Sequence, residues 1–206
     1  MSINQLTEAN PVWYNNSRGG DNMTNKEIFV ALAKRIEREG INQLMEWLDS
    51  TDFYTAPAST RFHGSHEGGL VEHSIAVHSR LYELAHFYNI QASDETIAIV
   101  ALFHDLCKVG MYKTEMRWRK DANNQWEQYP TYKRDEDFKF GGHGSKSMYI
   151  VQNFMKLTPE EAVAINCHMG QWDATTYSDV SSAYEDCPLA WALHVADEAA
   201  TYMDKA

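Results

Sequence analysis

The stretch ALFHDLCKVG, residues 101–110, joins the most apolar segment of the chain to a group of ionisable residues. Every residue from Ile97 to Phe103 is apolar, and His104 and Asp105 follow directly. A buried carboxylate is costly unless it is paired or binds a metal ion. The stretch therefore predicts a core helix whose end carries groups that need a partner.

Capping signals and apolar periodicity predict helices on both sides of this stretch. Thr24 and Glu27 form a capping-box pattern, and Thr158 is followed by a proline and by Glu161. Ser93 can cap the helix that leads to His104. Further helices are expected over residues 41–48, 70–88, 145–157 and 188–203, with a loop over residues 51–69.

One segment departs from the helical pattern. Residues 116–134, MRWRKDANNQWEQYPTYKR, alternate aromatic and polar side chains around a DANNQ turn. This pattern predicts a β-hairpin, with outer bounds of about 114–136. Residues 1–23 have no apolar period and are expected to form a flexible arm. The predicted fold is all-α, a single helical domain over residues 24–206 with one β-hairpin insertion.

Composition restricts the function. The 206 residues carry a net charge of −11, which argues against a broad nucleic-acid-binding surface. A small anionic substrate remains compatible, because bound metal ions can supply local positive charge. The chain has no apolar run of membrane-spanning length, no signal-peptide pattern and no disulfide spacing among its three cysteines. A cytoplasmic protein with no membrane partner is expected.

Several ionisable residues fall on the apolar stripes of different predicted helices. His73, His104, His168 and Asp197 each follow apolar residues at helical spacing, and His143 lies in the glycine-rich GGHG segment. Imidazole and carboxylate groups together suit Mn, Fe, Co or Zn. Periodicity alone leaves open whether these residues bind metal or are hydrogen-bonded core residues.

The order of these residues resembles the HD superfamily of metal-dependent phosphohydrolases. The resemblance covers residues 60–204 and includes EGGLVEHS (67–74), GGHG (141–144), CH (167–168) and HVADEA (194–199). The two extra histidines, His143 and His168, resemble the two-metal branch, which includes cyclic-dinucleotide phosphodiesterases and 3′-to-5′ exoribonucleases. EGGLVEHS is most similar to the exoribonuclease group. No nucleic-acid-binding domain is recognised before the HD-like part, so long RNA is not the expected substrate.

The resemblance implies two divalent metal ions, drawn from Mn, Fe, Co, Ni or Zn. A hydroxide that bridges them would attack phosphorus, and Asp105 would bridge the ions as a catalytic ligand. The implied enzyme is a phosphodiesterase or nucleotidase that acts on a nucleotide or a short oligonucleotide. The first ion would bind His73, His104, Asp105 and Asp197, and the second would bind His143, His168 and Asp105.

Further residues have an expected role in catalysis or substrate binding. Lys108 occupies the position of the family's lysine and would contact the substrate phosphate, or is simply a favourable charge at a helix end. His66 would act as an acid or contact the substrate, or is an ordinary loop histidine. Arg117, Trp118 and Arg119 could hold a base and its phosphates, or belong to an ordinary exposed hairpin.

Alternatives remain at the level of the sequence. An HD protein loaded with iron can be a di-iron oxygenase, and a non-catalytic regulator would bind a nucleotide without turning it over. A one-metal enzyme would leave His143 and His168 without a metal ion. Cys107 is assigned to packing, and the exposed aromatic residues and long arm permit a homodimer. Surface or supporting positions are expected for the other histidines, namely His63, His78, His86 and His194.

Overall fold

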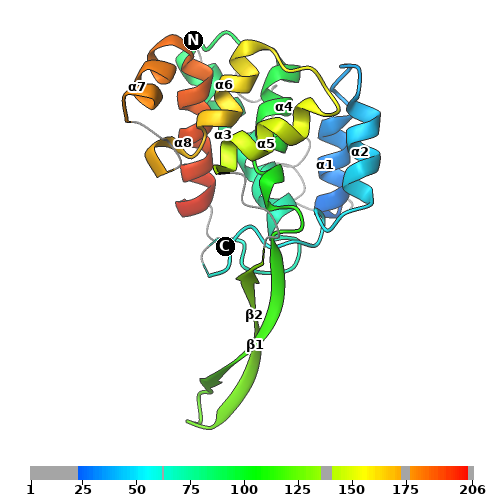
Figure 1. Cartoon of the computed structure of the whole chain (residues 1–206), viewed down its shortest axis with the longest axis vertical. Helices are drawn as coiled ribbons and strands as arrows, with labels where there is room; N and C mark the ends of the chain where they lie inside the picture. The colour runs from blue at the N-terminus through cyan, green and yellow to red at the C-terminus, as the bar shows by residue number, and fades with distance from the viewer. Residues whose placement is uncertain (1–22, 62, 136–140, 173–176, 204–206) are drawn as a thin grey trace, which may run out of the picture.

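The computed structural model describes residues 23–61, 63–135, 141–172 and 177–203, so the predicted N-terminal arm lies outside these residues except for its last position. Within these ranges eight α-helices form one body, from which a two-stranded antiparallel hairpin projects (Figure 1). The prediction of an all-α fold with one hairpin insertion is confirmed. None of the helices in these ranges has the length and hydropathy needed to cross a membrane.

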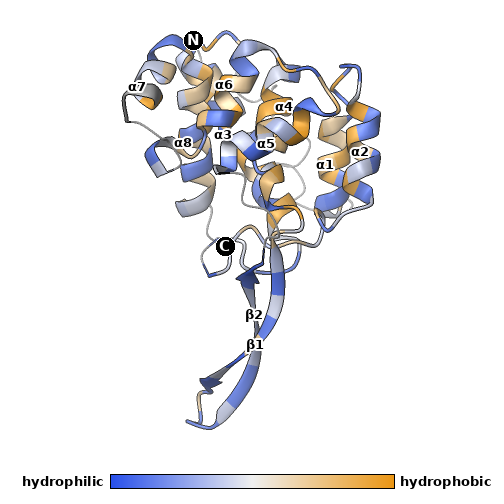
Figure 2. Cartoon of the chain, in the orientation of Figure 1, coloured by the Kyte–Doolittle hydropathy of each residue, from blue (hydrophilic) through white to orange (hydrophobic). Residues whose placement is uncertain are grey.

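The helices pack around α3 (Gly69–Tyr88) and α4 (Asp94–Phe103). α3 contacts α4 on one side and α8 (Pro188–Tyr202) on another, while α6 (Pro159–Cys167) contacts α4 and α8. Every α4 residue from Ile97 to Phe103 is buried, and α4 is strongly hydrophobic in Figure 2. The apolar run therefore places the end of α4, and His104 with it, inside the body.

Helices α1 (Asn25–Ala33), α2 (Ile41–Asp49) and α5 (His143–Gln152) surround this core. α1 contacts α3 and α4, and its Phe29 ring lies 5.0 Å from Phe53 and 6.0 Å from Phe103 between centroids. α2 follows α1, and α5 packs against α6. These positions agree with the predicted helices, although α5 extends from His143 to Gln152 rather than over residues 145–157.

The residues predicted to cap helices are observed at the helix N-termini. Thr24 and Thr158 both form complete capping boxes, with Glu27 and Glu161 as the reciprocal partners. The Ser93 hydroxyl accepts a hydrogen bond of 3.1 Å from the backbone N–H of Thr96. One helix, α7 (Tyr177–Asp186), was not predicted, because its serine-rich and acid-rich sequence has too few apolar residues to show a period.

The hairpin consists of β1 (Tyr112–Lys120) and β2 (Trp126–Arg134), paired from Tyr112 with Arg134 to Lys120 with Trp126. The Asp121 carboxylate accepts hydrogen bonds of 2.8 Å from the backbone N–H groups of Asn123 and Gln125. The predicted hairpin and its DANNQ turn are confirmed, with a first strand that begins earlier than expected.

Candidate metal centre

Two histidines occupy equivalent positions at the ends of α4 and α6. His104 is the C-cap of α4, and its Nδ1 lies 2.8 Å from the carbonyl oxygen of Ala101. His168 is the C-cap of α6, and its Nδ1 lies 2.7 Å from the carbonyl oxygen of Ile165. A carbonyl oxygen can only accept, so each Nδ1 carries the hydrogen of the neutral ring. Each Nε2 is then left with a lone pair.

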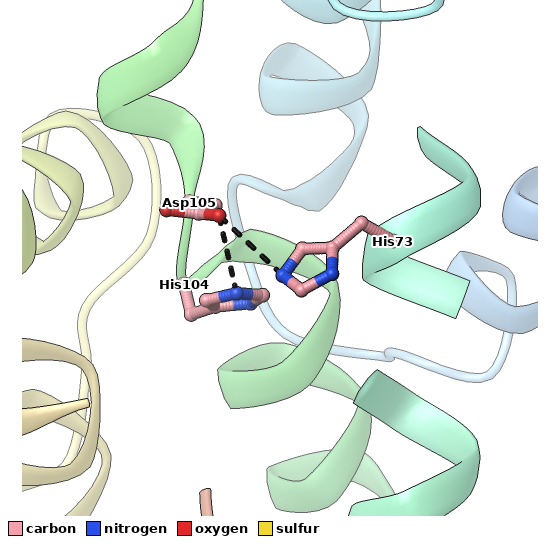
Figure 3. Close-up of side chains that lie close together, drawn as sticks. All are labelled: His73, His104 and Asp105. Atoms are coloured by element: carbon pink, nitrogen blue, oxygen red, sulfur yellow. Dashed lines mark ion pairs between the residues drawn. The ribbon is translucent and has the colours of Figure 1, made fainter. Parts of the chain in front are cut away.

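These two lone pairs point toward Asp105. His104 Nε2 lies 3.4 Å from Asp105 Oδ2, and His168 Nε2 lies 3.6 Å from Asp105 Oδ1. Figure 3 shows the Asp105 carboxylate joined by dashed lines to the rings of His104 and His73, which come from different segments of the chain. The carboxylate of Asp105 therefore lies at the centre of the cluster.

α3 and α8 complete the cluster. His73 Nε2 lies 3.6 Å from Asp105 Oδ2 and 3.0 Å from Asp197 Oδ1, and His104 Nε2 is 4.0 Å from the same Asp197 oxygen. All of these side chains are buried. The inward orientation predicted from helical periodicity for His73, His104, His168 and Asp197 is thus observed.

The hydrogen bonding of the cluster fits a metal ion. The Nε2 atoms of His73, His104 and His168 are buried and make no hydrogen bond, although carboxylate oxygens lie nearby. Buried polar atoms without partners are rare, because each one loses its hydration without compensation. A divalent cation would satisfy the nitrogen lone pairs and the carboxylates together, and a mixed nitrogen and oxygen donor set suits a transition metal.

Electrostatics keep the two carboxylates ionised. Burial raises the pKa of Asp105, but the positive charge of Lys108 outweighs it and holds the pKa well below its usual range. For Asp197, burial is likewise outweighed by His73 and His104, so its pKa is also lowered. Metal ligands must be deprotonated, and these two residues meet that condition.

Two ionisable neighbours of Asp105, Lys108 and Cys107, differ in their charge. Burial lowers the pKa of Lys108, but the adjacent Asp105 charge more than compensates, so the pKa is raised and the side chain is an ammonium group. Burial raises the pKa of the Cys107 thiol, and the Asp105 charge raises it further. A protonated, fully buried thiol agrees with the packing role expected for Cys107.

His143 approaches the cluster from the start of α5. Single donor atoms of Asp105, Cys107 and His143 lie within 4.8 Å of one another, as do those of two other groups of three. His168 groups with His104 and Asp197, rather than with His143 and Asp105 as the resemblance implies. Asp105 belongs to two of the three groups, among them the one with His73 and His104.

A glycine allows this approach of α5 to α6. A Cβ atom built on Gly144 would lie 2.1 Å from the carbonyl oxygen of Asn166 and 2.7 Å from that of Ile165. Both contacts are with backbone near the end of α6, which cannot move aside as a flexible side chain can. Gly144 therefore brings the helix start that carries His143 close to the helix end that carries His168.

The other predicted site residues lie in different surroundings. Lys108 is buried, with Nζ 2.5 Å from Asp105 Oδ2. His66 is exposed, and its Nε2 lies 2.8 Å from Glu72 Oε2. Arg117, Trp118 and Arg119 are exposed residues of β1, on the projecting hairpin (Figure 1).

One residue near the cluster was not recognised as a candidate ligand or substrate contact from the sequence. The His63 ring lies 4.9 Å from the His73 ring between centroids, and both of its nitrogens are buried without a hydrogen bond. Burial lowers the pKa of His63 to about 4. Because His63 lies in a loop, it has no helical stripe, and periodicity could not single it out.

Two further residues support the loop after α6. His194 Nδ1 lies 2.7 Å from the carbonyl oxygen of His168, which matches the supporting position expected for this histidine. The Tyr184 hydroxyl donates to the carbonyl oxygen of Cys167 at 3.1 Å, and its ring stacks on His194 at 5.7 Å. Tyr184 belongs to α7, so the sequence offered no signal for its role.

Comparison with known protein families identifies the chain's relationship. The family model of the HD domain matches residues 70–202, which include all six residues expected to bind metal. No curated protein and no solved structure gives a significant match to the chain.

Proposed function

The chain belongs to the HD domain family, and from that premise we propose that it is a metal-dependent phosphohydrolase. The proposed reaction is cleavage of a phosphate ester or anhydride in a nucleotide or a short oligonucleotide. One observation carries the proposal: three buried Nε2 atoms that make no hydrogen bond converge on two ionised carboxylates. Without a cation, these buried nitrogen atoms would have no partner to compensate for their lost hydration.

Divalent metal ions bound here would supply a nucleophile by lowering the pKa of water, and would neutralise charge on the phosphate. The protein's own part is to present its ligands deprotonated and fixed. The carbonyl groups of Ala101 and Ile165 hold the His104 and His168 rings in one tautomer, which is the usual task of groups behind a metal ligand. The residues that would hold the ions are His73, His104, Asp105, His143, His168 and Asp197.

Lys108 is the proposed phosphate contact. Its ammonium group is buried beside Asp105, and a phosphate oxygen that enters there would accept a charge-assisted hydrogen bond from Nζ. His63 and His66 are the two histidines of the preceding loop that could serve the leaving oxygen. His63 contacts His73, whereas His66 is exposed and paired with Glu72, so His63 is the better placed.

The test combines metal content with hydrolysis. We expect purified protein to contain divalent metal by elemental analysis and to hydrolyse bis(p-nitrophenyl) phosphate, with a panel of nucleotides and short oligonucleotides to follow. The variants His104→Gln and Asp105→Asn should lose both properties. His86→Gln is the matched control, because His86 is an exposed α3 histidine whose Nδ1 bonds only to the carbonyl of Tyr82. Equal hydrolysis by the wild type and the two cluster variants would refute the proposal.

A further inference from the structure

The two faces of the hairpin differ in chemistry. Residues paired across an antiparallel ladder lie on the same face, and successive residues alternate between faces. The register therefore assigns each of the hairpin's eighteen strand residues to one face. We call one of them the aromatic face; it consists of Tyr112, Thr114, Met116, Trp118, Lys120, Trp126, Gln128, Pro130, Tyr132 and Arg134.

The aromatic face is exposed and carries no negative charge. Met116, Trp118 and Trp126 have 53 %, 61 % and 65 % of their surface exposed. None of the ten residues of this face is acidic, and its two charged residues are Lys120 and Arg134. The Lys120 ammonium lies 5.7 Å from the centroid of the Trp126 ring.

On the opposite face, two of the four basic residues are paired with acidic residues of the same face. Arg117 pairs with Glu115, and Arg119 pairs with Glu127 at 2.6 Å. The Arg119 guanidinium also lies over the Tyr129 ring, 4.8 Å from its centroid. Trp118 therefore does not share a face with the two arginines that the sequence grouped with it.

The aromatic face begins next to the candidate metal centre. Tyr112, its first residue, lies four positions after Lys108. The backbone N–H of Met111 donates to the carbonyl of Lys108 at 3.1 Å, and the N–H of Asp135 donates to the carbonyl of Met111 at 2.9 Å. Both strands are thus anchored beside Lys108. Burial raises the pKa of Tyr112. The charge of Lys108 lowers this pKa by a smaller amount, and the charge of Asp105 raises it.

The net charge of the hairpin indicates which class of partner it binds. Residues 112–134 contain six basic and three acidic residues, a net charge of +3 in a chain whose net charge is −11. A polyanion is the partner that such a local reversal of sign attracts. Exposed aromatic rings such as Trp118 and Trp126, with a cation such as Lys120 beside them, are what sequence-tolerant binding of single-stranded nucleic acid requires. A second copy of the hairpin would bring like charge against this face.

We propose that the aromatic face binds a short single-stranded oligonucleotide, with its bases on Trp118 and Trp126 and its strand directed toward Lys108. The binding half of this inference stands alone. The delivery of a phosphodiester to the metal centre rests on the proposed hydrolase function.

Binding is measured by fluorescence anisotropy with a short fluorescein-labelled oligouridylate and the full chain, in EDTA so that no hydrolysis occurs. Trp118→Ala and Trp126→Ala should each weaken binding by about 5- to 150-fold, the range of one lost base–aromatic stack. Lys120→Gln should reduce the slope of log K against log salt concentration by about 0.7. Tyr129→Ala is the matched control, since it removes an aromatic ring from the opposite face and should leave affinity unchanged.

The two proposals fail separately. If the wild type does not bind the oligouridylate, or the tryptophan variants bind it as tightly as the wild type, the aromatic face is not its site, whatever the hydrolysis assay shows. If those variants change only the molecular mass in sedimentation, the face binds a second copy and the inference is overturned. Loss of binding in the tryptophan variants, with no metal-dependent hydrolysis of bis(p-nitrophenyl) phosphate by the wild type, would uphold the binding site and refute the hydrolase. Circular dichroism melting checks that each variant is folded.

Discussion

The His63 imidazole is a polar ring whose nitrogens contribute no hydrogen bond to the folded structure. Its two ring nitrogens are buried and make no hydrogen bond, and its ring contacts His73. His78 is also buried with an unpartnered Nδ1, and burial lowers its pKa to about 4. His63 is half-buried against His73, whereas His78 is buried and the charges that act on it are those of Arg35 and Asp94.

We expect His63→Leu to separate activity from stability. Replacing an unsatisfied polar ring by an apolar side chain removes no hydrogen bond, so the free energy of unfolding should be unchanged or higher. Turnover should fall by about 10²-fold, the contribution of one positioned acid or base. Urea unfolding and steady-state kinetics measure the two effects. His78→Leu is the control and should keep full turnover; a similar loss in both variants would show that the effect is structural.

At the scale of elements, the site depends on how closely α5 approaches the end of α6. Tyr184 of α7 and His194 of α8 hold the backbone carbonyls of Cys167 and His168 from one side. Gly144 lets α5 pack against the same segment from the other side. The positions of His143 and His168 therefore depend on three helices that contribute few ligands themselves.

Gly144→Ala should push these two helices apart. The added methyl group would overlap the Asn166 carbonyl, and such overpacking costs about 1–3 kcal/mol of unfolding free energy. Metal content should fall as well, because His143 and His168 would no longer face Asp105. Ser145→Ala, one residue further along α5, loses only a 3.2 Å bond to the Gly142 carbonyl and should retain wild-type metal content. Full metal content in Gly144→Ala would show that the close approach is not needed for binding.

At the scale of the whole molecule, the cluster joins four helices that extend along the chain from Gly69, where α3 begins, to Tyr202, where α8 ends. α3, α4, α6 and α8 each contribute at least one of its residues. A ligand that binds there links these four helices, and α5 through His143, so it stabilises the folded state as a whole.

Added Mn²⁺ should therefore raise the melting temperature of EDTA-treated protein. A ligand at a hundred times its Kd contributes about 2.7 kcal/mol, which corresponds to a shift of about 5–10 °C for a chain of this size. Differential scanning calorimetry measures the shift. Asp105→Asn should show a much smaller response, because it removes the central carboxylate. An equal shift in the wild type and in this variant would place the binding site elsewhere.

Much of the architecture followed from the amino-acid sequence, because its signals are local. Capping boxes at Thr24 and Thr158 depend on residues three positions apart, and the helical stripes that turn His73 and Asp197 inward depend on spacings of three and four. The alternation around DANNQ was sufficient to predict the hairpin. α7 was not predicted, because its residues show no periodic pattern of apolar side chains.

Only the tertiary structure decided how these elements make a site. It placed Asp105 between histidines of three helices, set the tautomers of His104 and His168, and brought His63 against His73. It also put Trp118 and the two arginines on opposite faces of the hairpin. Helix and hairpin formation depend on neighbours along the chain. Ligand grouping depends on distances between distant segments, which only the packing of the core determines.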